Sequence, residues 1–290
     1  MFLIHFIRAL RPYQWSKNLL VFAALIFSER FLHPADLLRT CLAFLFFCLT
    51  SGWVYVVNDV RDREADRLHP VKRLRPLASG DLKPAPALIL ATLLLLLGIV
   101  CSIRISPLLS LALVLYALMN LAYTFGLKNI VILDILLIAV GFVLRAVAGA
   151  WAIDVPISHW LLVCTFFLAL FLVIGKRRNE LVKLGDHAAG HRPILHEYNE
   201  AILDQMIGVV TAATIIAYAL YTVDGETVAK FGTDNLIYTI PFVVYGIFRY
   251  FYLIYKRQLG DAPEKILIRD RYILATVFLW LGMVIFILYG

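Results

Sequence analysis

The chain has 290 residues, of which 62% are hydrophobic and 16% are charged, and its formal net charge is +7. This apolar fraction lies far above that of a soluble domain, so the composition excludes a soluble globular protein and indicates a polytopic membrane protein. The basic excess follows from Lys and Arg beside the apolar runs, so we do not expect nucleic acid as a partner. All four cysteines fall in apolar runs without a CxxC pair, which favours buried free thiols over disulfides.

Apolar runs long enough to cross a bilayer of about 30 Å recur along the chain. They predict an all-α bundle of nine spans, at 18–33, 39–57, 84–102, 107–125, 130–151, 157–175, 203–222, 236–255 and 272–289. The first long apolar run lacks a small-residue cleavage site, which predicts an uncleaved anchor preceded by a short interfacial helix.

Lys and Arg are concentrated on the side of the membrane that holds the N-terminus. The positive-inside rule therefore places the N-terminus in the cytoplasm. Two long charged loops, at about 58–83 and 176–202, fall on the same side. We expect a single domain over residues 1–290 in the cell membrane, with an active site that faces the cytoplasm.

Near the N-terminus, a cation and an amide lie at the mouth of the first span, in Arg11-Pro12-Tyr13-Gln14-Trp15-Ser16-Lys17-Asn18. The tyrosine and the tryptophan are typical interface anchors. Lys17 and Asn18 are the candidates for contact with a substrate.

The densest group of polar side chains follows the second span, in Asn58-Asp59-Val60-Arg61-Asp62-Arg63-Glu64-Ala65-Asp66. On one helix, Asp59, Asp62 and Asp66 would lie within a sector of about 60°. Asn58 lies one turn before Asp62. Carboxylates on one face repel each other unless a cation lies among them, and oxygen ligands without His or Cys favour Mg²⁺. The stretch predicts a magnesium-diphosphate site with these four residues as ligands.

The alternative is a solvated helix end, where the acids pair with Arg61, Arg63 and Arg67. The loop that follows, residues 67–80, carries basic side chains between two prolines. It suits a cover over a metal-bound polyphosphate, and it also fits a simple positive-inside loop. Lys72 and Arg73 are its candidate phosphate ligands.

The fourth span carries a polar stripe of Tyr116, Asn120, Tyr123 and Thr124, which leads to Lys128 at its inner end. An Asn is costly against lipid, so the stripe is expected to face the bundle or a cavity. Hydrogen bonding between helices is the expected role of Asn120. Lys128 is a candidate for binding a phosphate.

The fifth span holds Asp134 and Arg145, about 16 Å apart along a helix axis. They cannot pair with each other, and we expect Arg145 to have a structural partner on a neighbouring helix. After the sixth span, Lys176, Glu180 and Lys183 share a helical face. We call this group the second charged pole, the first being the carboxylate cluster after the second span. The second pole is cationic, which fits direct phosphate binding, and the alternative is a stop-transfer cluster.

Together these motifs resemble the UbiA superfamily of intramembrane prenyltransferases, on Asn58-Asp59-x-x-Asp62-x-x-x-Asp66 and Lys72-Arg73-x-Arg75-Pro76-x-x-Ser79-Gly80. Further stretches resemble its branch of decaprenyl-phosphate phosphoribosyltransferases, namely Arg11-Pro12-x-Gln14-Trp15-x-Lys17-Asn18, Asn120-x-x-Tyr123 through Lys128, Asp134, Gly141 to Gly149, and Gly175-Lys176-Arg177. The resemblance covers nearly the whole chain.

One departure concerns the second pole. Aromatic prenyltransferases of the superfamily carry a second DxxxD-type motif after the sixth span, whereas residues 176–183 here contain only Glu180 as an acid. This departure puts a second metal cluster in doubt. It fits a reaction whose acceptor is itself a phosphate.

The resemblance implies a UbiA-like bundle that transfers the 5-phosphoribosyl group of 5-phosphoribosyl 1-diphosphate to a polyprenyl phosphate of decaprenyl type, with release of pyrophosphate. It implies Mg²⁺ held by Asn58 and Asp62, with Asp59 and Asp66 in support; the three aspartates are the catalytic set. The substrate contacts that it implies are Lys17, Asn18, Tyr55, Lys72, Arg73, Tyr123, Lys128, Lys176, Arg177 and Glu180.

Two other functions stay open at the level of the sequence. The first is prenyl transfer from a prenyl diphosphate to an aromatic acceptor, where the same magnesium face serves another donor. The second is a transporter, with Asp134 and Arg145 as an intramembrane relay. The length of the lipid and the oligomeric state, a homo-oligomer included, also stay open.

Overall fold

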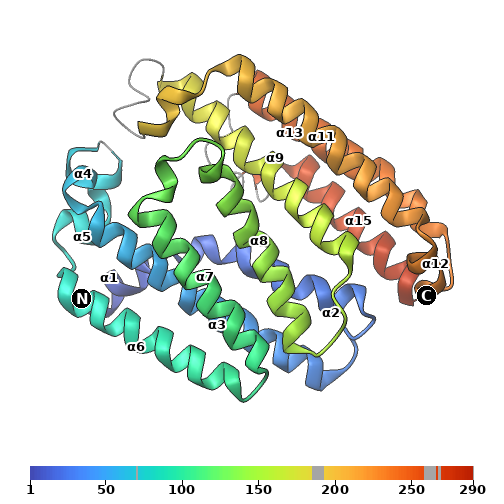
Figure 1. The fold of residues 1–290 in the computed structure, drawn as a ribbon, viewed down its shortest axis with the longest axis horizontal. Helices are drawn as coiled ribbons and strands as arrows, with labels where there is room; N and C mark the ends of the chain where they lie inside the picture. Colours follow the sequence, from blue (N-terminus) through green and yellow to red (C-terminus); the bar gives the residue numbers. More distant parts are fainter. Residues whose placement is uncertain (70, 185–192, 258–265, 267–268, 290) are drawn as a thin grey trace. The chain divides into compact units, whose positions relative to one another are not determined.

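The computed structural model describes residues 1–69, 71–184, 193–257, 266 and 269–289 (Figure 1). Within these ranges, every element is an α-helix or a 3-10 helix. In this described part of the chain, eight helical segments are long and apolar enough to cross a membrane: α3 (Pro34–Arg61), α6 (Pro84–Ile103), α7 (Pro107–Phe125), α8 (Leu133–Ala152), α9 (His159–Leu184), α11 (Glu200–Val223), η6 with α13 (Asn235–Arg257) and α15 (Arg271–Tyr289). The predicted all-α polytopic fold is confirmed.

The first predicted span, at 18–33, has a different form. Residues Pro12–Phe22 form a 3-10 helix, η1, and Ala23–Phe27 form the short helix α2. Asn18, in the middle of η1, is 1% exposed and donates to the hydroxyl of Ser51 on α3 at 3.2 Å. This segment therefore packs into the protein interior through a polar side chain. The short helix predicted before it is α1 (Phe2–Ala9).

Several elements begin with a proline, among them η1, α3, α5 (Pro76–Ser79), α6 and α7. Proline has no N–H to leave unpaired at this position, and its fixed φ suits the start of a helix. The prolines thus determine where these elements begin.

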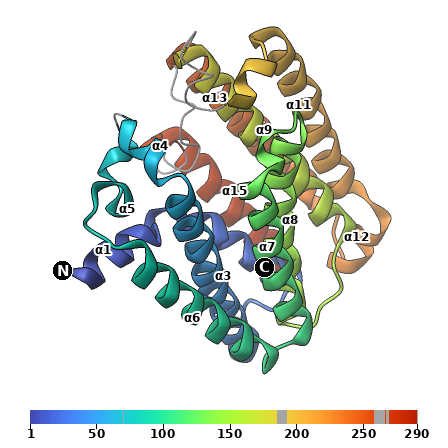
Figure 2. The ribbon, with the colours of Figure 1, turned by 60° about the vertical axis from the view of Figure 1, so that its left-hand side comes forward.

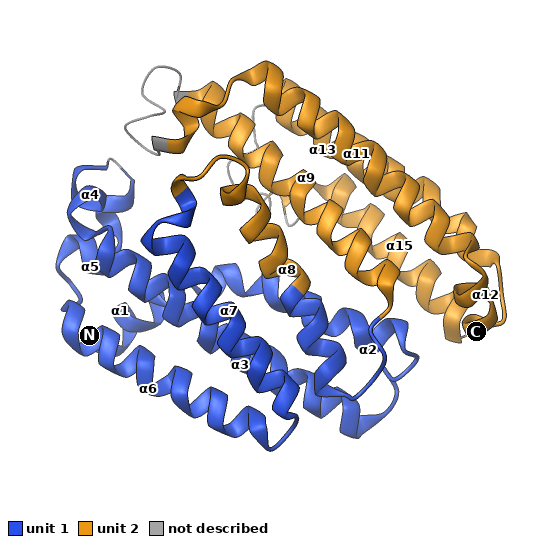
Figure 3. Ribbon diagram, viewed as in Figure 1, with its two compact units in different colours: residues 1–128, 144–157 blue, residues 129–143, 158–290 orange. Residues whose placement is uncertain are grey.

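The chain divides into two compact units (Figure 3). Unit 1 comprises residues 1–128 and 144–157, and unit 2 comprises residues 129–143 and 158–290, so that α8 contributes to both. The expectation of a single domain stays a prediction.

In unit 1, α3 packs beside α6 and α7 (Figures 1 and 2). Helix α6 buries small residues at intervals of about one turn, with Ala87 and Ala91 at most 1% exposed. It leaves large side chains such as Leu93, Leu97 and Val100 more than half exposed. Small residues inside and large apolar residues outside are typical of helices that pack in a lipid bilayer.

In unit 2, α9 runs beside α11, and α13 packs on α15 (Figures 1 and 2). The ring of Phe171 on α9 contacts the rings of Tyr250 and Phe251 on α13, at 5.2 and 5.5 Å between centroids. Gly175 lets the two helices approach closely, because a Cβ there would lie 2.8 Å from Ile254.

An ion pair joins the last two helices of unit 2. Arg249 of α13 donates to both carboxylate oxygens of Asp270, at 3.3 and 2.8 Å. Asp270 also accepts the N–H groups of Tyr272 and Ile273 in the first turn of α15. The bond from Arg249 holds the pKa of Asp270 below its ordinary value.

We expect this pair to make stability depend on pH in acid. Folding lowers the pKa of Asp270. The ion pair therefore adds its full contribution to the free energy of unfolding above the ordinary aspartate pKa of about 3.9, and this contribution is lost as the pH falls through the pKa of the folded state. The melting temperature in detergent should fall between about pH 5 and about pH 3. The fall should be smaller in Asp270→Asn than in the exposed control Asp234→Asn, and equal pH dependence in both variants would contradict the assignment.

Candidate active site

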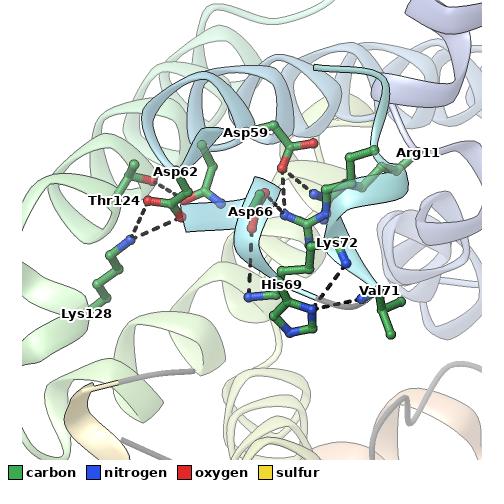
Figure 4. A network of polar contacts seen from close by, with 11 residues as sticks. Arg11, Asp59, Asp62, Asp66, His69, Val71, Lys72, Thr124 and Lys128 are labelled. Carbon is green, nitrogen blue, oxygen red and sulfur yellow. Dashed lines mark hydrogen bonds and ion pairs between the residues drawn. The ribbon is translucent and has the colours of Figure 1, made fainter. Parts of the chain in front are cut away.

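The carboxylate cluster lies where α3 ends. Helix α3 ends at Arg61 and α4 (Arg63–Leu68) begins two residues later, so Asp62 stands between them with a ψ of 8°. Backbone bonds from Asp62 N to Asn58 O and from Asp66 N to Asp62 O continue the helical pattern across the break. The predicted continuous helix is interrupted here, and its three aspartates divide into two groups (Figure 4).

Two arginines of this segment tie α4 to α5. Arg63 Nε donates to the carbonyl oxygen of Leu77 at 3.0 Å, and Arg67 Nε donates to that of Ala78 at 3.2 Å. Arg61 lies over the ring of Phe125, 4.5 Å from its centroid. The alternative of a solvated helix end, whose acids pair with these arginines, is met in one pair, because Arg67 Nη1 also donates to both carboxylate oxygens of the exposed Glu64 at 3.1 Å. The three aspartates have other partners, described below.

The first group of carboxylates shares the guanidinium of Arg75. Arg75 Nη1 donates to Asp59 Oδ1 at 3.0 Å and to Asp66 Oδ2 at 2.6 Å (Figure 4). Asp59 also accepts a hydrogen bond from Arg11 Nη2. The two aspartates are 2% and 3% exposed. A buried like-charged pair is costly unless it is compensated, and the two arginines supply that compensation.

Both of these arginines directly precede a proline that begins an element. Arg75 precedes Pro76 and has an extended backbone, with φ −69° and ψ 141°. Arg11 precedes Pro12 and has a left-handed backbone, with φ 55° and ψ 62°. A proline disfavours the helical conformation in the residue before it. Each arginine is therefore outside the helix that follows and reaches the aspartates from there.

The second group is more open. Asp62 pairs with Lys128 of η3 (Leu127–Asn129), whose Nζ lies 3.3 and 3.4 Å from the two carboxylate oxygens (Figure 4). The two side chains are 31% and 26% exposed. One turn earlier, Asn58 Oδ1 accepts from the hydroxyl of Thr124 at 3.5 Å. The predicted candidates Asn58, Asp62 and Lys128 are thus brought together.

The basic loop folds back on the same cluster. Lys72 Nζ lies 4.0 Å from Asp66 Oδ1. His69 Nδ1 accepts the backbone N–H groups of Val71 and Lys72, at 3.1 and 3.2 Å, which fixes the turn that carries this lysine. Arg73 is exposed on the same 3-10 turn, η2 (Lys72–Leu74).

The donor set of Asn58 and Asp62 fits Mg²⁺. Among the residues that the structure describes, no three His, Cys, Asp or Glu side chains form a group that would hold a metal ion. Mg²⁺ needs fewer protein ligands, because it usually binds one or two carboxylates together with waters and substrate phosphates. The ammonium of Lys128 shows that a cation is accommodated between both oxygens of Asp62.

The second charged pole lies in unit 2 and is built differently. Arg177 is 1% exposed, and it donates to Asp134 Oδ2 at 3.0 Å and to Glu180 Oε2 at 3.1 Å. Lys176, half-exposed, lies 3.8 Å from Glu180 Oε1. Asp134 is thus held in a buried ion pair with Arg177. Part of the predicted loop after this pole, residues 185–192, lies outside the described residues.

A tyrosine completes the surroundings of Asp134. Tyr198 donates to Asp134 Oδ1 at 2.8 Å and accepts the N–H of Ile132 at 2.7 Å. Ile132 has a φ of +69°, which is unfavourable for a β-branched side chain. Burial raises the pKa of Tyr198 to about 12, so its hydroxyl keeps its proton at neutral pH.

The remaining predicted site residues lie in unit 1. Tyr55 stacks under Arg11, with 4.8 Å from the guanidinium to the ring centroid. Lys17 and Tyr123 are half-buried on η1 and α7. Asn18 is bonded inside the bundle and accepts from Arg145 Nε at 2.7 Å.

Sequence reasoning assigned no role in these two poles to Arg11, Arg75 or Tyr198, and it placed Thr124 only in the polar stripe of the fourth span. The Arg-Pro dipeptides at positions 11 and 75 are the signal that could have identified the first two. Tyr198 had no such signal, because its partners are 64 and 66 residues away in the chain.

Comparison with known proteins identifies the family of the chain. The model of the UbiA prenyltransferase family matches residues 19–282. The chain belongs to this family. As a family member it is a transferase, and its apolar helices make it a multi-pass membrane protein. The transporter alternative is set aside.

Curated relatives within the UbiA family cover most of the chain. A decaprenyl-phosphate phosphoribosyltransferase of Mycolicibacterium smegmatis is 35% identical over 293 residues, which span 96% of this chain and 90% of that protein. One of Corynebacterium glutamicum is 33% identical over 98% of this chain and 86% of its own length. The resemblance stated from the sequence motifs is confirmed.

Solved structures of the UbiA family share the fold. A UbiA homolog from Archaeoglobus fulgidus bound to GPP and Mg²⁺ has a TM-score of 0.73, at 21% identity, over 99% of this chain and 100% of that one. At this identity the likeness establishes the fold alone.

The buried pair of unit 2 gives a test of stability. We expect Arg177→Met to lose about 3–5 kcal/mol, because Asp134 stays buried without its cation. Replacing both partners, in Asp134→Leu with Arg177→Met, should recover most of that loss. Lys176→Met, the half-exposed neighbour, should lose less than about 1 kcal/mol. Thermal melting in detergent measures all three, and a double variant less stable than Arg177→Met would refute the assignment.

Proposed function

We propose that this chain transfers the 5-phosphoribosyl group of 5-phosphoribosyl 1-diphosphate to a polyprenyl phosphate and releases pyrophosphate. The observation that carries the proposal is the near full-length match to relatives whose names state a decaprenyl-phosphate acceptor and a phosphoribosyl group. The two charged poles support it, because both substrates are phosphates.

The reaction needs alignment and charge compensation more than acid or base catalysis. An oxygen of the acceptor phosphate bonds to C1 of the ribose while the bond from C1 to the diphosphate oxygen breaks, and pyrophosphate carries away the electron pair. The acceptor oxygen is already anionic at neutral pH, so no proton has to be removed. The transition state resembles an oxocarbenium ion, which the neighbouring charges stabilise.

Asn58 and Asp62 would hold Mg²⁺ on the donor diphosphate. The ion would neutralise charge on the leaving group. Asp59 and Asp66 would act indirectly. The arginines that bind them keep the end of α3, and so Asn58 and Asp62, in place. Lys128 exchanges its contact with Asp62 for a contact with a substrate phosphate when the donor arrives.

The basic loop grips the donor. Lys72, set by His69 beside Asp66, and the exposed Arg73 supply cations for its phosphates. Tyr55, which stacks against Arg11 beside this group, would contact the donor. A short lysine-bearing turn fixed by a side-chain acceptor suits a loop that must close over a polyphosphate.

In unit 1, Lys17 and Tyr123 remain as predicted contacts for a substrate phosphate, and Lys176 remains in unit 2. Asn18 is buried and bonded to Arg145 and Ser51, so its role is structural. Arg177 and Glu180 have a positioning role. The Arg177 guanidinium is buried against Asp134, and the Glu180 carboxylate accepts a hydrogen bond from that guanidinium. An apolar groove between helices would take the lipid tail. We place the N-terminus and this chemistry on the cytoplasmic side of the cell membrane, as the distribution of Lys and Arg favours.

A paired assay with MgCl₂ tests the function. Labelled 5-phosphoribosyl 1-diphosphate with polyprenyl phosphate forms one arm, and prenyl diphosphate with an aromatic acid forms the other. We expect a lipid-extractable label in the first arm alone, and its loss with EDTA. Product in the second arm alone would replace the proposal with aromatic prenyl transfer.

The metal face predicts a matched pair of variants in that assay. Asp62→Asn should lower kcat/KM about 100-fold or more, because one carboxylate ligand of the leaving-group metal is lost. Glu64→Gln, whose carboxylate is exposed two residues away, should keep wild-type activity. Equal activity of both variants would contradict the assignment of Asp62.

A further inference from the structure

The length of η1 is unusual for its helix type. It runs for 11 residues as a 3-10 helix. Such helices have poorer hydrogen-bond geometry than α-helices, so runs longer than three or four residues are uncommon and often mark strain. Something outside the segment must hold it in this form.

One anchor lies at the N-terminal end of η1. Arg11 has a left-handed backbone, which disfavours a non-glycine residue. Its side chain bonds the buried Asp59 and stacks on Tyr55. The strained residue is thus held by the carboxylate cluster.

The second anchor lies seven residues further on. Asn18 accepts from Arg145 Nε at 2.7 Å, and its amide nitrogen donates to Ser51 Oγ at 3.2 Å. Arg145 is 4% exposed, and its Nη2 donates to the hydroxyl of Tyr116 at 2.7 Å. Its guanidinium also lies 4.7 Å from the centroid of the Tyr116 ring. A charge inside a bundle is retained only where it is well bonded.

A backbone contact reinforces this anchor. Gly149 lies one turn after Arg145 on α8, and Val21 lies one 3-10 turn after Asn18. A Cβ on Gly149 would lie 1.9 Å from the carbonyl oxygen of Val21, so only glycine allows this approach. Successive turns of α8 therefore bind successive turns of η1.

We propose that Arg145 is a positioning residue, which holds η1 in its extended 3-10 form and so sets Arg11 against Asp59. The rise per residue is about 2.0 Å in a 3-10 helix and about 1.5 Å in an α-helix. Arg11 and Asn18 are seven residue steps apart. If this segment relaxed to an α-helix, the two residues would approach each other by about 3–4 Å. That displacement exceeds the length of a hydrogen bond. The effect on catalysis rests on the function proposed above.

The first test is a double-mutant cycle on kcat/KM. Sites far apart that share no partner normally give additive effects. Because Arg145 acts through Arg11, Arg145→Gln should cost about 10-fold in the wild type and no more than about twofold in an Arg11→Gln background. The loss should appear in the KM of the diphosphate donor. Full additivity would overturn the proposal.

Two further variants separate positioning from general destabilisation. Gly149→Ala should reproduce the donor KM defect, because its methyl group displaces η1 without removing a charge. Ser102→Ala removes a buried bond to Ser110 between α6 and α7 and should leave the donor KM unchanged. If Ser102→Ala gave the same defect, the effect of Arg145 would be one of stability and the proposal would fail.

A structural readout tests the inference without activity. Spin labels are placed at Tyr13→Cys, which is an exposed position of η1, and at the native exposed Cys101 of α6, in a background without Cys41 and Cys164. Arg145→Gln should shift the measured distance by about 3 Å, and an unchanged distance would overturn the proposal. If the wild type transfers no phosphoribosyl group, the proposed function fails while this distance still decides the role of Arg145.

Discussion

The bridge from Arg75 to Asp59 and Asp66 determines the form of the whole charged end of unit 1. Two carboxylates that are nearly excluded from solvent would repel each other, and each would lose its hydration. The guanidinium of Arg75 compensates both carboxylates, and that of Arg11 also binds Asp59. The turn after α3, the start of α5 and the start of η1 all follow from where these two arginines must lie. Of these three aspartates, Asp62 is the most exposed, and it pairs with Lys128.

The two charged poles contain the same residue types, but the ion pair has a different role in each. In unit 1, the pair of Asp62 and Lys128 is about one-third exposed, so it can be exchanged for a metal and a phosphate at low cost. In unit 2, the pair of Asp134 and Arg177 is almost fully buried, so breaking it would be costly. Burial, rather than residue type, separates the exchangeable contact from the structural one.

Apolar run length and the prolines were sufficient to predict most of the fold. The starts expected at 84 and 107 coincide with Pro84 and Pro107. The 3-10 form of η1 could not be predicted, because it depends on Asn18 meeting Arg145, 127 residues further along the chain. The periodicity of a segment predicts which residues share a helical face, but it does not predict contacts with side chains that are distant in the sequence.

The candidate site was predicted in its residue types and in part of its grouping. Asn58 and Asp62 lie one turn apart, as their spacing predicted, whereas the contact of Lys128 with Asp62 was not predicted. The separation of Asp62 from Asp59 and Asp66 could not be predicted, because it depends on the bend that Arg63 and Arg67 impose through carbonyl groups of α5. Whether a carboxylate meets arginine or stays open is decided by such tertiary contacts.

The central claim is that Asp62 with Asn58, and not the arginine-bound pair, is the metal-binding face. The most direct measurement is a Mn²⁺ titration of the purified protein by electron paramagnetic resonance in the presence of inorganic pyrophosphate. Asp62→Asn should weaken Mn²⁺ binding at least about 10-fold, because a charged oxygen ligand is lost. Asp66→Asn should stay within about threefold of wild type. Strong loss in Asp66→Asn with wild-type binding in Asp62→Asn would contradict the account.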